Sequence, residues 1–106
     1  MKNYEIIFDS VILEQLKDAG KNIHIKNILT KMLDKIEELG PSSGKLLDSH
    51  LFMYEIKSKH PPIRLYFKHL KDSNKIYVFE YELKTSEDKQ KKTIFRLKDK
   101  VRSLFR

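Results

Sequence analysis

Apolar and polar residues follow two different patterns along the chain, with helical spacing in the first half and strand-like runs in the second. Residues 4–8 form a short apolar run that predicts a strand, after which Asp9 or Ser10 can cap a helix. This helix should end at Gly20. Its predicted apolar face consists of Ile12, Leu13, Leu16 and Ala19.

The clearest helical pattern lies between residues 25 and 39, where apolar residues recur at i, i+3, i+4 and i+7. These residues are Ile25, Ile28, Leu29, Met32, Ile36 and Leu39. Gly40 and Pro41 should end the helix, and residues 40–44 are expected to be a connecting loop. Because only a short link separates the two helices, they should form a hairpin.

Aromatic and β-branched residues dominate three runs in the second half, at residues 51–57, 63–69 and 76–83. His60-Pro61-Pro62 separates the first two runs, and the polar residues 71–74 form a turn between the last two. Since short links join consecutive strands, the three strands should form an antiparallel meander.

A last helix is expected from about Ser86 to Phe105, with Thr85 as its candidate cap. Its apolar stripe consists of Ile94, Leu97, Val101, Leu104 and Phe105. Residues 1–106 then form a single α+β domain with a strand, a helix hairpin, a three-stranded antiparallel meander and a C-terminal helix. We expect the helices to pack on one face of the sheet.

Alternation along the strands sorts their side chains onto two faces of the sheet. The face expected to pack on the helix hairpin carries Ile63, Leu65 and Phe67, together with Tyr77, Phe79, Tyr81 and Leu83. The other face, expected to be open, is rich in charge. It presents Lys57, Arg64, Tyr66, Lys68, Glu82 and Lys84. An open sheet face with this many cations is a plausible surface for nucleic acid.

The net charge of +7 is unevenly distributed, since residues 84–106 carry nine Lys/Arg and only three Asp/Glu. This asymmetry indicates an anionic partner, or else a lysine-rich helix that is only solvated. One basic stripe on the last helix consists of Lys89, Lys92, Arg96 and Lys100. No cysteine, signal-peptide pattern or membrane-length apolar run is present, so we expect a cytoplasmic protein without membrane contact.

Arg64 is the most informative single residue, because it interrupts an otherwise apolar strand and needs an anionic partner there. That partner could be Glu82 or Glu55 across the sheet, or a phosphate gripped by the guanidinium fork, and the two options are compatible. Lys59 and His60 lie nearby in the same strand end and loop. The remaining histidines show no metal-ligand spacing, which argues against a metal site.

The order and spacing of these segments resemble the RelE/ParE toxin superfamily, the small toxins of toxin–antitoxin pairs. The resemblance covers nearly the whole chain. It rests on Lys45-Leu46-Leu47, on LFMYEI at 51–56, on IRLYF at 63–67 and on residues 76–84. A RelE-like or HigB-like member is a ribosome-dependent mRNA endonuclease, an mRNA interferase that inhibits translation. It uses no metal or other cofactor, because the 2′-hydroxyl of the message attacks the adjacent phosphate.

The resemblance also implies roles for individual residues and partners. Arg64 matches the arginine that stabilises the transition state, and Lys84 matches the basic residue that ends the last strand. Lys57 and Lys59 lie near lysines that bind phosphate or transfer protons, and Tyr66 could replace a late catalytic tyrosine where this chain has Phe95. The implied RNA-binding residues are Lys59, His60, Lys68, Lys89, Lys92 and Arg96. The implied partners are the ribosome, mRNA and a cognate antitoxin bound in a hetero-oligomer.

Two other functions remain compatible with the sequence. A ParE-like member inhibits DNA gyrase and carries no nuclease site. A degenerate member would bind RNA without cutting it. The chain also lacks the second lysine and the Thr-Pro that many HigB-like members have after the last strand, with Asp88 near that point.

Overall fold

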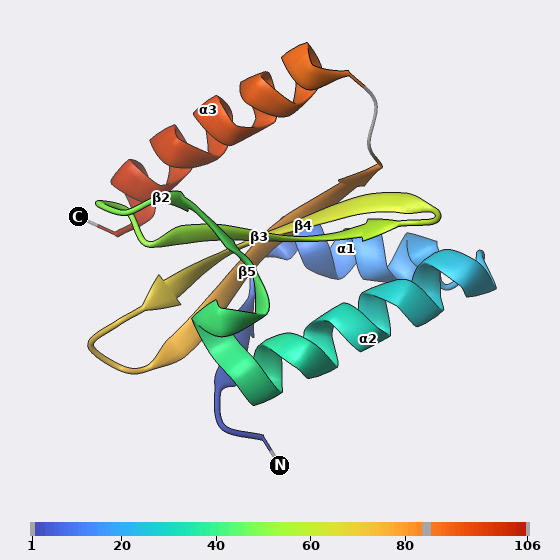
Figure 1. Ribbon diagram of the computed structural model, residues 1–106, viewed down its shortest axis with the longest axis horizontal. Coiled ribbons are helices and arrows are strands. Elements are labelled where there is room, and N and C mark those ends of the chain that lie inside the picture. Colours follow the sequence, from blue (N-terminus) through green and yellow to red (C-terminus); the bar gives the residue numbers. More distant parts are fainter. Residues whose placement is uncertain (1, 84–85, 106) are drawn as a thin grey trace.

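The computed structural model describes residues 2–83 and 86–105 (Figure 1). Its elements, in chain order, are β1 (Glu5–Phe8), α1 (Ser10–Ala19), α2 (Ile23–Leu39), the short 3₁₀ helix η1 (Gly40–Ser43), β2 (Lys45–Asp48), β3 (Met53–Lys59), β4 (Pro62–Leu70), β5 (Lys75–Leu83) and α3 (Glu87–Leu104). This confirms the predicted α+β order of strand, helix hairpin, meander and C-terminal helix. The 40–44 segment is partly helical rather than an irregular loop, and β2 was not predicted.

The strands form one mixed sheet in the order β1-β5-β4-β3-β2. The meander β3-β4-β5 is antiparallel, as expected, and β2 extends it by pairing antiparallel to β3. At the opposite edge β1 pairs parallel to β5. The helix hairpin of α1 and α2 carries the chain from β1 to β2 at the other edge, and the meander then returns it to β5. Consequently β4, which carries Arg64, lies at the centre of the sheet.

Polar caps and a glycine set the ends of the helices. Asp9 caps α1 by accepting a hydrogen bond from the Val11 N–H, and Asn22 caps α2. Gly40 ends α2 with φ +57°, in the left-handed region, and a Cβ there would collide with the ring of Tyr4. The Ser86 hydroxyl caps α3 by accepting a hydrogen bond from the Lys89 N–H, and Thr85, the predicted cap, lies outside the described residues.

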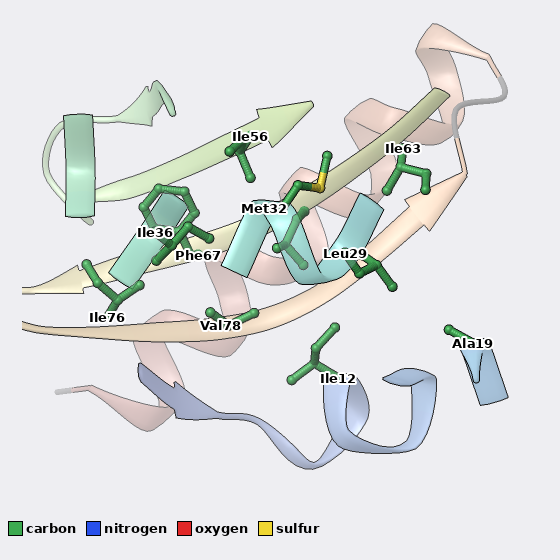
Figure 2. Packing of buried hydrophobic residues seen from close by; sticks show 11 residues of the cluster. Ile12, Ala19, Leu29, Met32, Ile36, Ile56, Ile63, Phe67, Ile76 and Val78 are labelled. Atoms are coloured by element: carbon green, nitrogen blue, oxygen red, sulfur yellow. The ribbon is translucent and has the colours of Figure 1, made fainter. Parts of the chain in front are cut away.

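The larger core lies between the helix hairpin and one face of the sheet, as predicted (Figure 2). Ile12, Leu29, Met32 and Ile36 from the helices pack there against strand residues. The strand residues are Ile56, Ile63, Leu65, Phe67, Ile76 and Val78. Leu13 was expected on the buried face of α1, but it is 53% exposed because Ile12 and Leu16 occupy that face.

The opposite face of the sheet is covered by α3, as Figure 1 also shows. Leu97 and Val101 of α3 pack on Met53, Tyr66 and Phe79 in a second core. The expectation that all helices lie on one face, with the other face open, is therefore wrong for α3. The physical reason is that this face contains enough apolar strand residues to bind an amphipathic helix.

A bulge in β5 explains why the second core was not predicted. The register shifts where Tyr66 pairs with Glu80 while the next residue, Phe67, pairs with Val78, which leaves Phe79 as the extra residue. Phe79 therefore faces α3, whereas Tyr81 contacts the hairpin core. The prediction that Tyr77, Phe79, Tyr81 and Leu83 share one face is wrong, since the bulge reverses the alternation midway along the strand.

Asp9 links α3 to the rest of the fold through an ion pair with Lys100. Its carboxylate is buried and accepts hydrogen bonds from Lys100 Nζ at 2.8 Å, from the Tyr77 hydroxyl at 2.7 Å and from the Val11 N–H at 3.0 Å. Burial alone would raise the pKa of Asp9, but these hydrogen bonds outweigh burial and lower it below the usual range. The charged carboxylate therefore stabilises the folded state.

Replacing Asp9 by asparagine should lower the free energy of unfolding by about 2 kcal/mol at pH 7, as expected for hydrogen bonds to a charged group. A carboxyl whose folded pKa is lowered contributes stability above its unfolded pKa of about 3.9 and loses it as the pH falls through the folded value. The difference between Asp9→Asn and wild type should therefore shrink below about pH 4. Urea unfolding at pH 7, 5 and 3 measures this, with exposed Asp34→Asn as the control. A difference that does not change with pH would contradict the account.

Candidate functional site

A hollow of about 320 Å³ lies where β3 turns into β4. Its lining consists of Lys57, Ser58, Lys59, His60, Pro62 and Arg64. The antiparallel register creates this grouping, since it pairs Lys57 with Arg64 and Lys59 with Pro62. Four residues predicted for the site, Lys57, Lys59, His60 and Arg64, are thus brought together in one cationic hollow. We call this the Arg64 hollow.

Arg64 is held by a buried carboxylate. Its Nη1 donates to both carboxylate oxygens of Glu55 at 3.0 Å, and only 8% of Arg64 and 3% of Glu55 are exposed. Of the two partners that the sequence left open, Glu55 is therefore the one used. The Nε of Arg64 is buried and has no hydrogen-bond partner among residues 2–83 and 86–105. A buried unpaired donor is costly, and such a group often marks a site that awaits a ligand.

Glu82 has different partners. One of its carboxylate oxygens accepts from the Tyr66 hydroxyl, and the other accepts from the Thr93 hydroxyl of α3 at 2.7 Å. Tyr66 is fully buried beneath α3, and burial together with Glu82 raises its pKa well above the ordinary value. The structure therefore places Tyr66 under the helix and outside the lining of the Arg64 hollow.

Lys68 lies toward the other end of β4 and is also buried. Its ammonium donates to the Leu51 carbonyl and lies 5.5 Å from the ring centroid of Phe52 and 5.7 Å from that of Phe105. Burial lowers the pKa of Lys68. This predicted RNA-binding residue is consequently separated from Lys57 and Lys59 and covered by the C-terminal segment.

Two of the four residues in the basic stripe of α3 form ion pairs with carboxylates. Arg96 donates two hydrogen bonds to Glu80, at 3.0 and 2.6 Å, and the pKa of Arg96 is raised by this carboxylate. Lys100 binds Asp9, as described above. Lys89 and Lys92 are exposed. Half of the stripe therefore serves to attach α3 to the sheet, which sequence spacing alone did not reveal.

Lys84, predicted as a catalytic residue, lies outside the described residues. Within residues 2–83 and 86–105, no three His, Asp or Glu side chains are arranged to hold a metal ion. None of the helices in these ranges is long and apolar enough to cross a membrane.

Solved structures with the same architecture were found by comparison. The isolated E. coli RelE toxin matches with a TM-score of 0.65 and 19% sequence identity, over 89% of this chain and 98% of that chain. A double mutant of the same toxin in the free state matches with a TM-score of 0.67 and 19% identity, over 91% and 98%. The toxin in the intact E. coli RelBE toxin-antitoxin complex matches with a TM-score of 0.62 and 19% identity, over 78% and 99%.

No protein-family sequence model and no curated protein sequence matches the chain. The likeness therefore lies in the structure. A sequence identity this low supports a shared fold and nothing more. It extends over almost the full length of the solved toxins and includes both the sheet and the helices. The chain has the fold of the RelE toxin.

Proposed function

We propose that the protein is the toxin of a type II toxin–antitoxin pair and that it cuts mRNA on the ribosome without a metal. The observation that carries this proposal is Arg64, a buried guanidinium whose Nε has no partner in the described part of the chain. It lies in a hollow lined by Lys57, Lys59 and His60. The RelE-like fold supports it. A concentration of cations in a hollow suits a phosphodiester, whose charge grows during cleavage.

The reaction needs no group beyond the RNA and the protein. The 2′-hydroxyl of the message loses its proton and attacks the adjacent phosphorus, and the bond to the 5′-oxygen of the next nucleotide breaks. The products are a 2′,3′-cyclic phosphate and a 5′-hydroxyl that has gained a proton. Arg64 would stabilise the charge on the phosphate, and Lys57 and Lys59 would bind its oxygens.

Exposed side chains at the rim of the hollow would transfer the protons of the reaction. His60 is exposed at this rim, and an imidazole can both accept and donate a proton during cleavage. Lys84 stays a predicted catalytic residue, together with Arg64 and Lys57. Tyr66 is the least suitable of the predicted catalytic residues, because its buried hydroxyl is bound to Glu82. Lys89 and Lys92 remain proposed RNA-binding residues on α3.

A cognate antitoxin is the proposed regulator. E. coli RelE is found in a complex with the antitoxin RelB and with a RelB peptide. A partly acidic antitoxin of this kind would cover the cationic surface of the present chain and form a hetero-oligomer with it. Because ribosomes and mRNA are its proposed targets, the protein would act in the cytoplasm.

One observation favours a second candidate, RNA binding without cleavage. Among the four predicted catalytic residues, Tyr66 is enclosed under α3 and offers no free hydroxyl to a substrate. A protein of this kind would keep the Arg64 hollow as an anion site. Binding to message with no shortened product would distinguish it from the nuclease.

Induced expression in bacteria tests the proposed nuclease. Primer extension on abundant messages should show new ends at codon boundaries within translated regions, because the cut would occur on the ribosome. Co-expression of the protein encoded by the neighbouring reading frame should remove these ends. Growth arrest with intact messages and DNA-damage signalling would instead indicate gyrase inhibition and would contradict the proposal.

A further inference from the structure

Two more hollows adjoin the Arg64 hollow and share residues with it. A groove of about 330 Å³ between α2 and β3 has an apolar floor and a basic rim. It is lined by Ile28, Lys31, Met32, Lys35, Ile56, Lys57 and Ser58. A further hollow of about 270 Å³ continues from Lys57 and Lys35 to Lys45. Lys57 lines all three, so the three hollows meet at this residue. We call the one between α2 and β3 the α2 groove.

The local topology leaves this groove uncovered. β2 pairs with β3 only as far as Glu55, which lies opposite Lys45. Beyond that point, residues 56–59 have no strand partner on their outer edge among the described residues. α2 lies beside this edge, with Ile28 and Met32 directed toward it. The result is an extended channel whose backbone edge and lysines are accessible.

The lysines around this channel are exposed and have no described acidic partner. Lys31, Lys35, Lys45, Lys57 and Lys59 are exposed, and none of them forms an ion pair with a residue of 2–83 or 86–105. By contrast, the cations in the last three turns of α3 are all neutralised by carboxylates. They are Arg96, Lys98, Lys100 and Arg102. Positive charge is therefore available beside α2, although the sequence concentrates it in the C-terminal quarter.

We propose that the α2 groove binds the substrate message beyond the cut site, an inference that rests on the proposed nuclease function. The strand would leave the Arg64 hollow over Lys57 and place successive phosphates against Lys35 and Lys31. These two lysines lie four residues apart on one helix face, about 6 Å along the axis. Ile28, which is only partly buried, would contact sugars and base faces.

Continuity with the Arg64 hollow favours RNA over an acidic peptide as the occupant. A strand held at its scissile phosphate by Arg64 must leave the hollow in two directions, and the shared Lys57 provides one of these exits. The mixed lining also suits a polynucleotide, which presents charged phosphates on one side and flat apolar surfaces on the other. Lysines contact phosphates without reading sequence, so this groove would set affinity and position rather than codon preference.

Binding to programmed ribosomes tests the inference. The probes are two messages with a 2′-O-methyl group at the cut site, one ending a single nucleotide beyond it and one extending ten nucleotides further. Lys31→Ala/Lys35→Ala should bind ribosomes with the long message on the order of tenfold more weakly than wild type, because two phosphate contacts are lost. With the short message the two proteins should bind equally. Alanine preserves the helix, so α2 should remain folded.

A matched double variant controls for the loss of charge. Lys17→Ala/Lys26→Ala also removes two exposed helix lysines, but neither lines the channel. It should bind both complexes like wild type. Equal weakening with the short message would indicate contact with ribosomal RNA and would overturn the inference, as would weakening in the control variant.

The outcomes of this experiment distinguish a failure of the groove inference from a failure of the proposed nuclease function. If Lys31→Ala/Lys35→Ala binds and cuts like wild type, the groove does not hold the message, while the nuclease proposal stands. If that variant cuts normally but escapes the antitoxin, the groove is a protein-binding site and the inference is wrong. If wild type neither binds programmed ribosomes nor cuts their message, both proposals fall.

Discussion

Arg64→Lys should slow the cutting of ribosome-bound message by about 10²–10³-fold, the loss typical when one preorganised donor to a transition state is removed. Lysine keeps the positive charge that Glu55 requires, so the fold should survive. A lysine ammonium lacks the planar guanidinium that binds Glu55 through Nη1 and could also face a phosphate. The expected defect therefore lies in the chemical step.

Single-turnover cleavage on programmed ribosomes measures this defect, since it separates the chemical step from product release. Arg102→Lys is the matched control, because Arg102 pairs with Asp99 on the exposed side of α3. It should cut like wild type. An Arg64→Lys variant with an undiminished cutting rate would mean that Arg64 serves only to neutralise Glu55, and the assignment of its role would be wrong.

Removing one member of the Arg64–Glu55 pair should have the largest effect on stability. Arg64→Ala leaves a carboxylate that is only 3% exposed without its cation, and breaking such a buried pair costs about 3–5 kcal/mol. This is a large share of the roughly 5–15 kcal/mol that holds a typical domain together. Replacing both members by apolar residues, as in Glu55→Leu/Arg64→Met, should restore stability to within about 1 kcal/mol of wild type.

Urea unfolding of Arg64→Ala measures this cost, and the cycle of Glu55→Leu, Arg64→Met and the double variant measures the coupling between the residues. The double variant should be folded and inactive, which would show that the pair is retained for the site and not for stability. If Arg64→Ala cost under about 1 kcal/mol, the pair would behave as a solvated surface ion pair. That result would contradict the burial on which the proposed anion site depends.

Local patterns were sufficient to predict most of the fold. The i, i+3, i+7 spacing of Leu29, Met32 and Ile36 correctly identified the buried face of α2. Short turns correctly predicted the antiparallel meander. β2 was missed because its four residues, KLLD, are too short to show alternation. The placement of α3 was wrong because the bulge at Phe79 depends on pairing with β4, which a single strand does not encode.

The candidate site was predictable to a similar extent. A cation in an apolar strand singled out Arg64, and proximity in the sequence grouped it with Lys57, Lys59 and His60. Alternation also placed Tyr66 and Lys68 on the same face as Arg64, but it could not show that α3 and the C-terminal segment cover them. The sequence does not single out Lys31 and Lys35, because their segment has no excess charge and only the folded chain brings α2 beside β3.

The most direct test of the central claim uses purified protein and ribosomes programmed with two messages that differ by one oxygen atom. The first is ordinary mRNA, and the second has a 2′-deoxynucleotide at the mapped cut site. We expect the first to be cut in the presence of a chelator, giving a 2′,3′-cyclic phosphate and a 5′-hydroxyl, and the second to stay intact there. Equal cutting of both messages, or of neither, would contradict the claim that the Arg64 hollow cuts RNA through its own 2′-hydroxyl.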